Sequence, residues 1–157
     1  GGCRCQRLGH FSSRLSELIV MLLLEQVIKS RLAGRSALAA WQVRGASELC
    51  DRTKVPAIEV RMSGAGLGDV SREAAQLEPR WSCVLVAKRS ESAAAELDAA
   101  MEEVVGCLHG WRPVSPGGRA WSELRAAGVR EAEFVDAGLV GYAVEFTTVS
   151  VFESLDA

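Results

Sequence analysis

The chain has few of the residues on which most catalytic sites are built. Only two histidines, His10 and His109, occur among its 157 residues. The sequence contains no Gly-x-Ser-x-Gly turn, phosphate-binding loop or His-Glu-x-x-His helix. His109 follows a predicted helix, where the helix dipole favours a histidine whatever the function. We therefore expect no enzyme, no cofactor and no catalytic residue.

Positive charge is not in excess either. Lysine and arginine total 18 against 20 acidic residues, and lysine occurs only at positions 29, 54 and 88. A net charge of −2 gives no overall field to attract nucleic acid or an anionic membrane. Four tryptophans could stack on bases, but basic residues are not interleaved with them in a dense patch. No specific nucleic-acid binding is expected.

No apolar run is long enough to cross a membrane. Residues 18–24 are apolar but number seven, and Glu25 follows them. A spanning helix needs about 20 apolar residues. No small-residue cleavage site of a secretory signal follows the run. The sequence predicts no contact with a membrane.

The five cysteines do not form a disulfide or metal pattern. Their number is odd, and Cys83 and Cys107 fall at apolar positions where a thiol behaves as a small hydrophobe. Cys3, Cys5 and His10 lack the paired spacing of a structural zinc site. We expect no metal and a chain that folds in a reducing cytosol.

What the chain does contain is a clear strand and helix unit between residues 79 and 113. Residues 81–88 (WSCVLVAK) are apolar on both alternating faces, which predicts a central strand covered on both sides. Residues 93–108 carry apolar side chains at helical spacing. Gly110 then suits a left-handed helix cap, and Pro113 prevents the helix from resuming.

A second helix is predicted from Ser12 or Ser13 to about Leu32, with Glu25 among the residues on its wet side. Its apolar arc is wider than one face, so the helix is either nearly buried or shared with a neighbouring subunit. Residues 1–11 have no periodicity and are expected to be disordered or loosely packed. Residues 12–157 are then a single domain.

Residues 57–62 predict a strand with one dry face and one wet face, the latter carrying Glu59 and Arg61. Residues 63–79 are glycine-rich. A dinucleotide-binding fingerprint would need a glycine at position 69, which is aspartate. We therefore expect a long mobile loop here.

The end of the chain predicts a β-hairpin, with strands over residues 131–135 and 139–146 and positive φ at Gly138. The apolar alternation shifts phase at Val149 and Val151, which indicates a bulge near 147–148 or a strand leaving the sheet. Residues 120–127 are ambiguous, and within residues 35–55 only a short extended piece at 41–43 is indicated. The whole predicts an α+β fold, with a mixed or antiparallel sheet of about four strands and two main helices packed on one face.

One ordered set of motifs stands above this background. It consists of residues 55–60 (VPAIEV), a glycine-rich segment, residues 81–86 (WSCVLV), a helix, and residues 108–113 (LHGWRP) and 142–146 (YAVEF). In this order it resembles the tail-terminator and minor tail proteins of tailed bacteriophages and phage-tail-like particles. The resemblance covers about residues 12–150.

The resemblance implies a structural protein of the virion tail, assembled in the cytoplasm of the bacterial host. Such a protein forms a ring, usually of six copies, on the head-proximal end of the tail tube. It stops polymerisation of the tube and provides the surface that joins the head. The implied partners are other copies of the chain, the tail tube protein, and the head-tail connector or a neighbouring tail or sheath protein. DNA would pass through the ring.

Two groups of residues are candidates for these contacts. One is the glycine-rich segment, and the other is an acidic group near Asp136 that could line the hole. The candidates are Gly64, Gly66, Gly68, Asp69, Arg72, Glu131 and Glu133. The expected structural anchors are Trp81, Gly110, Trp111, Pro113, Tyr142 and Phe146, with the Trp111 ring folded back on the sheet. Two alternatives remain open: an intracellular oligomeric binding or regulatory domain, and a small hydrolase.

Overall fold

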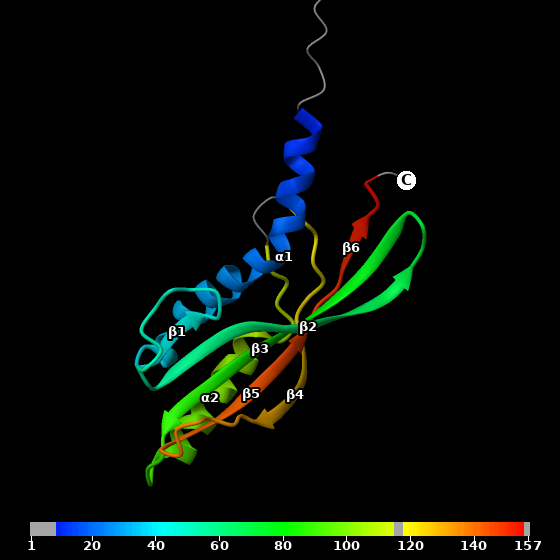
Figure 1. Ribbon diagram of the computed structural model, residues 1–157. Coiled ribbons are helices and arrows are strands. Elements are labelled where there is room, and N and C mark those ends of the chain that lie inside the picture. The colour runs from blue at the N-terminus through cyan, green and yellow to red at the C-terminus, as the bar shows by residue number, and fades with distance from the viewer. Residues whose placement is uncertain (1–8, 115–117, 156–157) are drawn as a thin grey trace, which may run out of the picture.

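The computed structural model describes residues 9–114 and 118–155, with the backbone alone for residues 9–20. Two helices cover one face of a mixed sheet, and part of the sheet projects beyond them (Figure 1). The predicted α+β class is confirmed, with six strands in place of about four. The elements are α1 (Gly9–Ala33), the 3-10 helix η1 (Ser36–Leu38), β1 (Gln42–Gly45), β2 (Ala57–Val70), β3 (Ala74–Lys88), α2 (Ala93–Leu108), β4 (Arg125–Glu131), β5 (Leu139–Thr147) and β6 (Ser150–Glu153).

The sheet has the strand order β1-β2-β3-β5-β4, and β3 is central, as its sequence predicts. β1 runs parallel to β2, and the other described pairs are antiparallel. β5 and β6 pair with β3 one after the other in a single register, with Thr147 opposite Arg80 and Ser150 opposite Leu77. The long strand β3 therefore organises both the sheet and its projecting part.

The predicted mobile loop over residues 63–79 is wrong. Most of these residues extend β2 and β3, and Gly64 and Gly66 lie opposite Arg80 and Glu78 in the ladder. The turn between the strands closes where the backbone N–H of Ser71 donates to the Ala74 carbonyl at 2.8 Å. We call residues 63–80 the arm (Figure 1). The glycines mark it as a loop in the sequence, but pairing with a strand distant in sequence decides its structure.

Both helices pack on one face of the sheet, as predicted. They share one apolar cluster with alternate residues of the strands, because side chains of one parity along a strand point to the same face. Arg31 at the end of α1 donates from Nε to the Cys107 carbonyl of α2 at 2.8 Å. The larger aliphatic side chains that the helices and strands contribute are Leu24, Ile28 and Leu32 from α1, Leu97, Val104 and Leu108 from α2, and Ile58, Val60, Leu85 and Val144 from the sheet.

Helix α1 differs from its predicted form in two ways. It begins at Gly9, before Ser12, so part of the segment expected to be loose is helical; residues 1–8 lie outside the described part. Glu25, expected on the wet side, is 5% exposed, because its carboxylate accepts hydrogen bonds from the backbone N–H and hydroxyl of Ser47. Leu22 and Leu23, by contrast, are exposed. The helix is thus partly in the core and partly uncovered.

The corner after α2 contains the predicted left-handed glycine. Gly110 has φ of +79°, and its N–H donates to the Leu124 carbonyl at 2.7 Å. Trp111 is half-buried, packs against the core cluster and lies beneath the Arg31 guanidinium, 4.6 Å from the ring centroid. Trp121, in the segment that the sequence left ambiguous, is 2% exposed. Among the other expected anchors, Trp81, Pro113 and Phe146 are buried and Tyr142 is half-buried.

The predicted hairpin near the end of the chain is wrong at its turn. The first strand is β4, which ends at Glu131, and residues 132–138 form the connection. Asp136 Oδ1 accepts the Gly138 N–H at 2.8 Å, and Gly138 does not have positive φ. Glycine is required instead at position 141, where an added Cβ would lie 1.9 Å from the Leu85 carbonyl oxygen.

The apolar pattern shifts phase after β5, but the side chains of the strand keep their alternation between the two faces of the sheet. The pairing with β3 continues without a register shift, so Phe146, Ser150 and Phe152 all lie on the helix side of the sheet. The ladder is interrupted at 148–149, where the Val149 N–H donates to the Ser122 hydroxyl at 2.9 Å. Val151 points away from the helices and is 56% exposed. The apolar residues that shifted the pattern are therefore outward-facing.

Trp121→Ala should lower the free energy of unfolding by about 3–5 kcal/mol, the usual range for truncating a large buried side chain. Trp111→Ala should cost clearly less, because its ring is half-buried and its contact with Arg31 is of the kind worth about 0.5–1 kcal/mol at exposed sites. Urea unfolding followed by circular dichroism measures both changes. Equal losses would contradict the assignment of Trp121 to the core and Trp111 to its rim.

Candidate interaction surfaces

The described residues do not assemble a catalytic or metal-binding constellation. Among residues 9–114 and 118–155, apart from the side chains of 9–20, no group of three or more His, Cys, Asp or Glu side chains is placed to hold a metal ion. In the same part of the chain, no helix is long and apolar enough to cross a membrane. The Nδ1 atom of His109 accepts the backbone N–H of Ala126 at 3.0 Å, which ties the end of α2 to β4.

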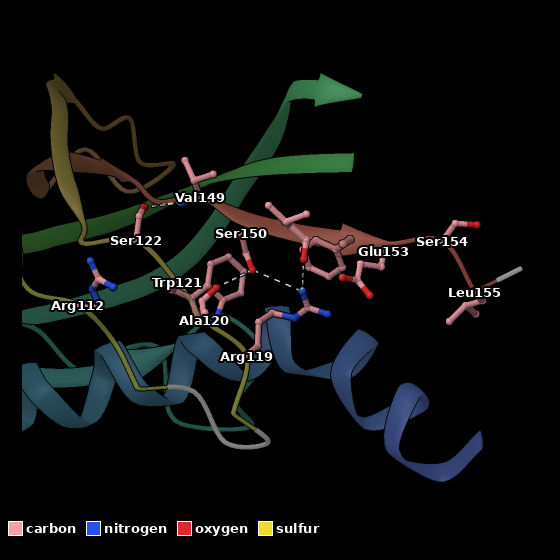
Figure 2. A pocket seen from close by; sticks show the side chains of 12 residues that line it. Arg112, Arg119, Ala120, Trp121, Ser122, Val149, Ser150, Glu153, Ser154 and Leu155 are labelled. Carbon is pink, nitrogen blue, oxygen red and sulfur yellow. Dashed lines mark hydrogen bonds between the residues drawn. The ribbon is translucent and has the colours of Figure 1, made fainter. Parts of the chain in front are cut away.

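A cavity of about 580 Å³ lies beside β6 and the segment 118–122 (Figure 2). Its apolar part includes Trp121 and Phe152, whose ring centroids are 6.5 Å apart with the planes at 69°. The Arg119 guanidinium lies 3.6 Å from the Phe152 centroid and donates to the Val151 carbonyl at 2.9 Å. The other lining residues are Arg112, Ala120, Ser122, Val149, Ser150, Glu153, Ser154 and Leu155.

Several polar groups of this cavity are already bound to the chain itself. Two of its serines are engaged with the chain itself, since Ser150 Oγ donates to the Ala120 carbonyl at 2.7 Å and the hydroxyls of Ser122 and Thr148 are 3.1 Å apart. No histidine is among the described residues that line it. Apolar walls with two guanidinium groups favour an apolar side chain that has a carboxylate beside it.

A second surface is the loop between β1 and β2, residues 46–56, which we call the β1–β2 loop. Arg52 fixes this loop from within by donating to the carbonyls of Ala46 and Glu48, both at 2.8 Å, and to that of Gly45 at 3.2 Å. Glu48 in turn accepts hydrogen bonds from Gln26 and Lys29 of α1. Despite these restraints, Leu49 is fully exposed to solvent.

The base of the loop is held by Glu59, which the sequence places on the wet face but which is 8% exposed. Its carboxylate pairs with three guanidinium groups: Arg52 at 2.6 Å, Arg44 at 3.4 Å and Arg61. Burial alone raises the pKa of Glu59. The hydrogen bond and charge of Arg61, with the charges of Arg52 and Arg44, outweigh burial, so the pKa lies below its ordinary value of 4.5.

The predicted contact residues fall into two separate groups. Gly64, Gly66, Gly68, Asp69 and Arg72 all lie on the arm. Arm residues Leu67 and Val70 are 65% and 61% exposed, which makes the arm an uncovered apolar surface.

The acidic group lies elsewhere on the sheet. Glu131 is opposite Tyr142, which is itself opposite Leu85, so it belongs to the end of β3 remote from the arm. Glu133 and Asp136 are exposed in the connection that follows. The structure therefore does not bring the two predicted groups together. The sequence missed the cavity and Leu49; an isolated leucine in a charged loop was the signal for the latter.

Comparison with known proteins identifies a related fold. No family model matches the chain, and no curated protein sequence is detectably similar to it. A chain of a solved structure described as "Virion of native gene transfer agent (GTA) particle" superposes with a TM-score of 0.60. The two chains share a fold. The match covers 83% of this chain and 95% of the other, at 14% sequence identity, so it concerns architecture and not individual contact residues.

Glu59→Gln should destabilise the protein at pH 7, because three arginines lose their shared counter-charge. The folded-state pKa of Glu59 is depressed, so its contribution is full above the unfolded-state pKa and is lost as pH falls through the folded-state pKa. The stability gap between parent and variant should therefore narrow below about pH 4. Urea unfolding of both proteins at pH 7, 5 and 3 measures this difference in the free energy of unfolding.

Glu145→Gln is the control for this experiment. It removes a more exposed ion pair, with Arg130 at 3.0 Å, and pairs of this kind contribute about 0–1 kcal/mol. A gap for Glu59→Gln that stays constant from pH 7 to pH 3 would show that its charge does not stabilise the fold.

Proposed function

We propose that the chain is a structural assembly protein of a phage or phage-tail-like particle. Its role is to form a ring, of six copies, on the head-proximal end of the tail tube. The ring stops polymerisation of the tube and offers a joining surface to the head connector. The observation that carries this proposal is the fold shared with a virion chain, of which the match covers 95%. The order of sequence motifs, which resembles tail terminators, supports the same role independently.

The surfaces of the molecule suit such a role. A ring is a closed heterologous assembly, so each subunit needs two different patches that complement one another. The described chain has several separate exposed apolar features: Leu22 and Leu23 on α1, Leu49 on the β1–β2 loop, and Leu67 and Val70 on the arm. We assign the arm to the tail tube protein or a neighbouring subunit, because it projects from the sheet (Figure 1) and its residues Leu67 and Val70 are exposed.

The proposal is tested by producing the particle with and without this protein. With it, tails should have uniform length and carry a ring at one end in negative-stain images. Without it, tube polymerisation should continue and tail lengths should spread. The mass of the isolated ring, measured by light scattering, should be that of six 16.8 kDa chains. Tails of unchanged length without the protein, together with a monomeric or dimeric protein in solution, would refute the proposal.

The acidic group suits the surface that faces DNA. Glu131 and Arg130 are neighbours in β4 and therefore point to opposite faces of the sheet, and Arg130 is paired with Glu145 at 3.0 Å. Glu131, Glu133 and Asp136 make no ion pair within the described part of the chain. Acids at the hole would let a genome pass without accumulating phosphate contacts.

Glu131→Lys combined with Glu133→Lys should leave the fold and the ring intact but make the ring retain duplex DNA, with retention falling as salt rises. A gel-shift titration at 50 and 200 mM salt measures the effect. Asp98→Lys with Glu102→Lys, exposed on α2, adds the same charge away from the proposed hole. If both double variants bind DNA equally, Glu131 and Glu133 do not line the hole.

A further inference from the structure

Leu49 is exposed to solvent on the β1–β2 loop, and several hydrogen bonds fix the backbone of this loop. Leu49 is fully exposed, and its neighbour Glu48 is fixed through both its side chain and its carbonyl. Single exposed leucines are common on protein surfaces. A leucine on a loop that three backbone contacts of Arg52 prevent from collapsing is different, because its binding geometry is set before a partner arrives.

The cavity beside β6 has the complementary character. Trp121 and Phe152 supply apolar surface, and its volume of about 580 Å³ exceeds what one small side chain would fill. It is within the size range of sites that enclose a ligand of several groups. The cavity lies beside β6, whereas the β1–β2 loop is at the β1 edge of the sheet, on a different side of the molecule (Figures 1 and 2). One copy cannot fill its own cavity with its own Leu49.

The charges beside these two features are also complementary. Asp51 is exposed two residues from Leu49, and its carboxylate is oriented by the backbone N–H of Thr53 at 3.0 Å. No cation forms an ion pair with it among the described side chains. Arg112 is exposed at the cavity and likewise has no ion pair within the described part of the chain. A carboxylate and a guanidinium brought together at the edge of an apolar contact favour one orientation of the partners.

We propose that Leu49 of one copy inserts into the cavity beside β6 of the next copy, with Asp51 of the first facing Arg112 of the second. This inference rests on the proposed ring and names the contact that builds it. Because the projection and the cavity occupy different places on the subunit, each copy can bind one neighbour on each side, which is the requirement for a ring.

Two variants test the two halves of the contact. Leu49→Lys places a cation where Arg112 and Arg119 lie, and Ala120→Arg places a bulky like charge at a residue that lines the cavity. Both residues are exposed in the free subunit, so the melting temperature should stay that of the parent. Each variant alone should be monomeric where the parent forms rings, with association weakened by about 30-fold or more, as for a hot-spot side chain. Val135→Lys, at a fully exposed valine in the 132–138 connection, is the matched control and should form rings.

Mixing the two variants gives the decisive measurement. The Leu49→Lys copy retains an intact cavity, and the Ala120→Arg copy retains an intact leucine, so an equimolar mixture should form 1:1 dimers that cannot grow further. Native mass spectrometry distinguishes these from monomers and rings. Rings formed by either variant alone, or a mixture that remains monomeric, would overturn the contact. Rings in the variants would leave the proposed function standing, whereas a parent that never forms rings would count against both.

Discussion

The register between β2 and β3 is the constraint on which the other parts depend. β1 pairs with β2, and β5 and β6 pair with β3, so every strand but β4 is placed directly by one member of this hairpin. A slip of one residue would turn either Ile58 and Val60 or their partners Leu85 and Cys83 from the helix side to the opposite face. Pairing of β2 with β3 continues into the arm past a register shift between Met62 and Gly64. A surface for contact is therefore built as an extension of the ladder that forms the core.

The Glu59 cluster shows how the fold holds a loop without adding much stability. Removing the carboxylate of Glu59 and the guanidinium of Arg44 from water costs free energy that their attraction repays only in part. Replacement of the whole cluster by well-packed apolar residues of similar volume is often neutral for stability. What the arginines add is geometry, because Arg52 reaches from Glu59 to the Gly45 carbonyl at the end of β1 and to two carbonyls of the β1–β2 loop. The position of Leu49 follows from this arrangement.

Local patterns predicted the elements whose partners are close in sequence. The strand over 81–88, the helix over 93–108 and the left-handed Gly110 follow from alternation, helical spacing and the absence of a Cβ. The arm was missed because alternating glycines are typical of a loop, and the pairing of this segment with β3 is not visible in the local sequence. Glu25 and Glu59 were placed in water because their partners, Ser47 and the arginines, are not visible in a periodic pattern. The cavity was missed because it needs residues 118–122 and β6 together.

The exposed aliphatic side chains separate assembly from folding. Leu22, Leu49, Leu67 and Val70 are more than half exposed in the isolated subunit, so they add little to its stability and are available to an interface. Covering one such side chain gains about 1.5–3 kcal/mol, against an association cost of about 4–15 kcal/mol for each subunit. A single contact of this kind therefore gives weak pairs. A closed ring has as many contacts as subunits, one more than an open chain of the same size, and this extra contact forms without further loss of translational freedom. Weak and specific contacts thus favour a complete ring over partial ones, which is the property that an assembly needs if only finished rings are to act.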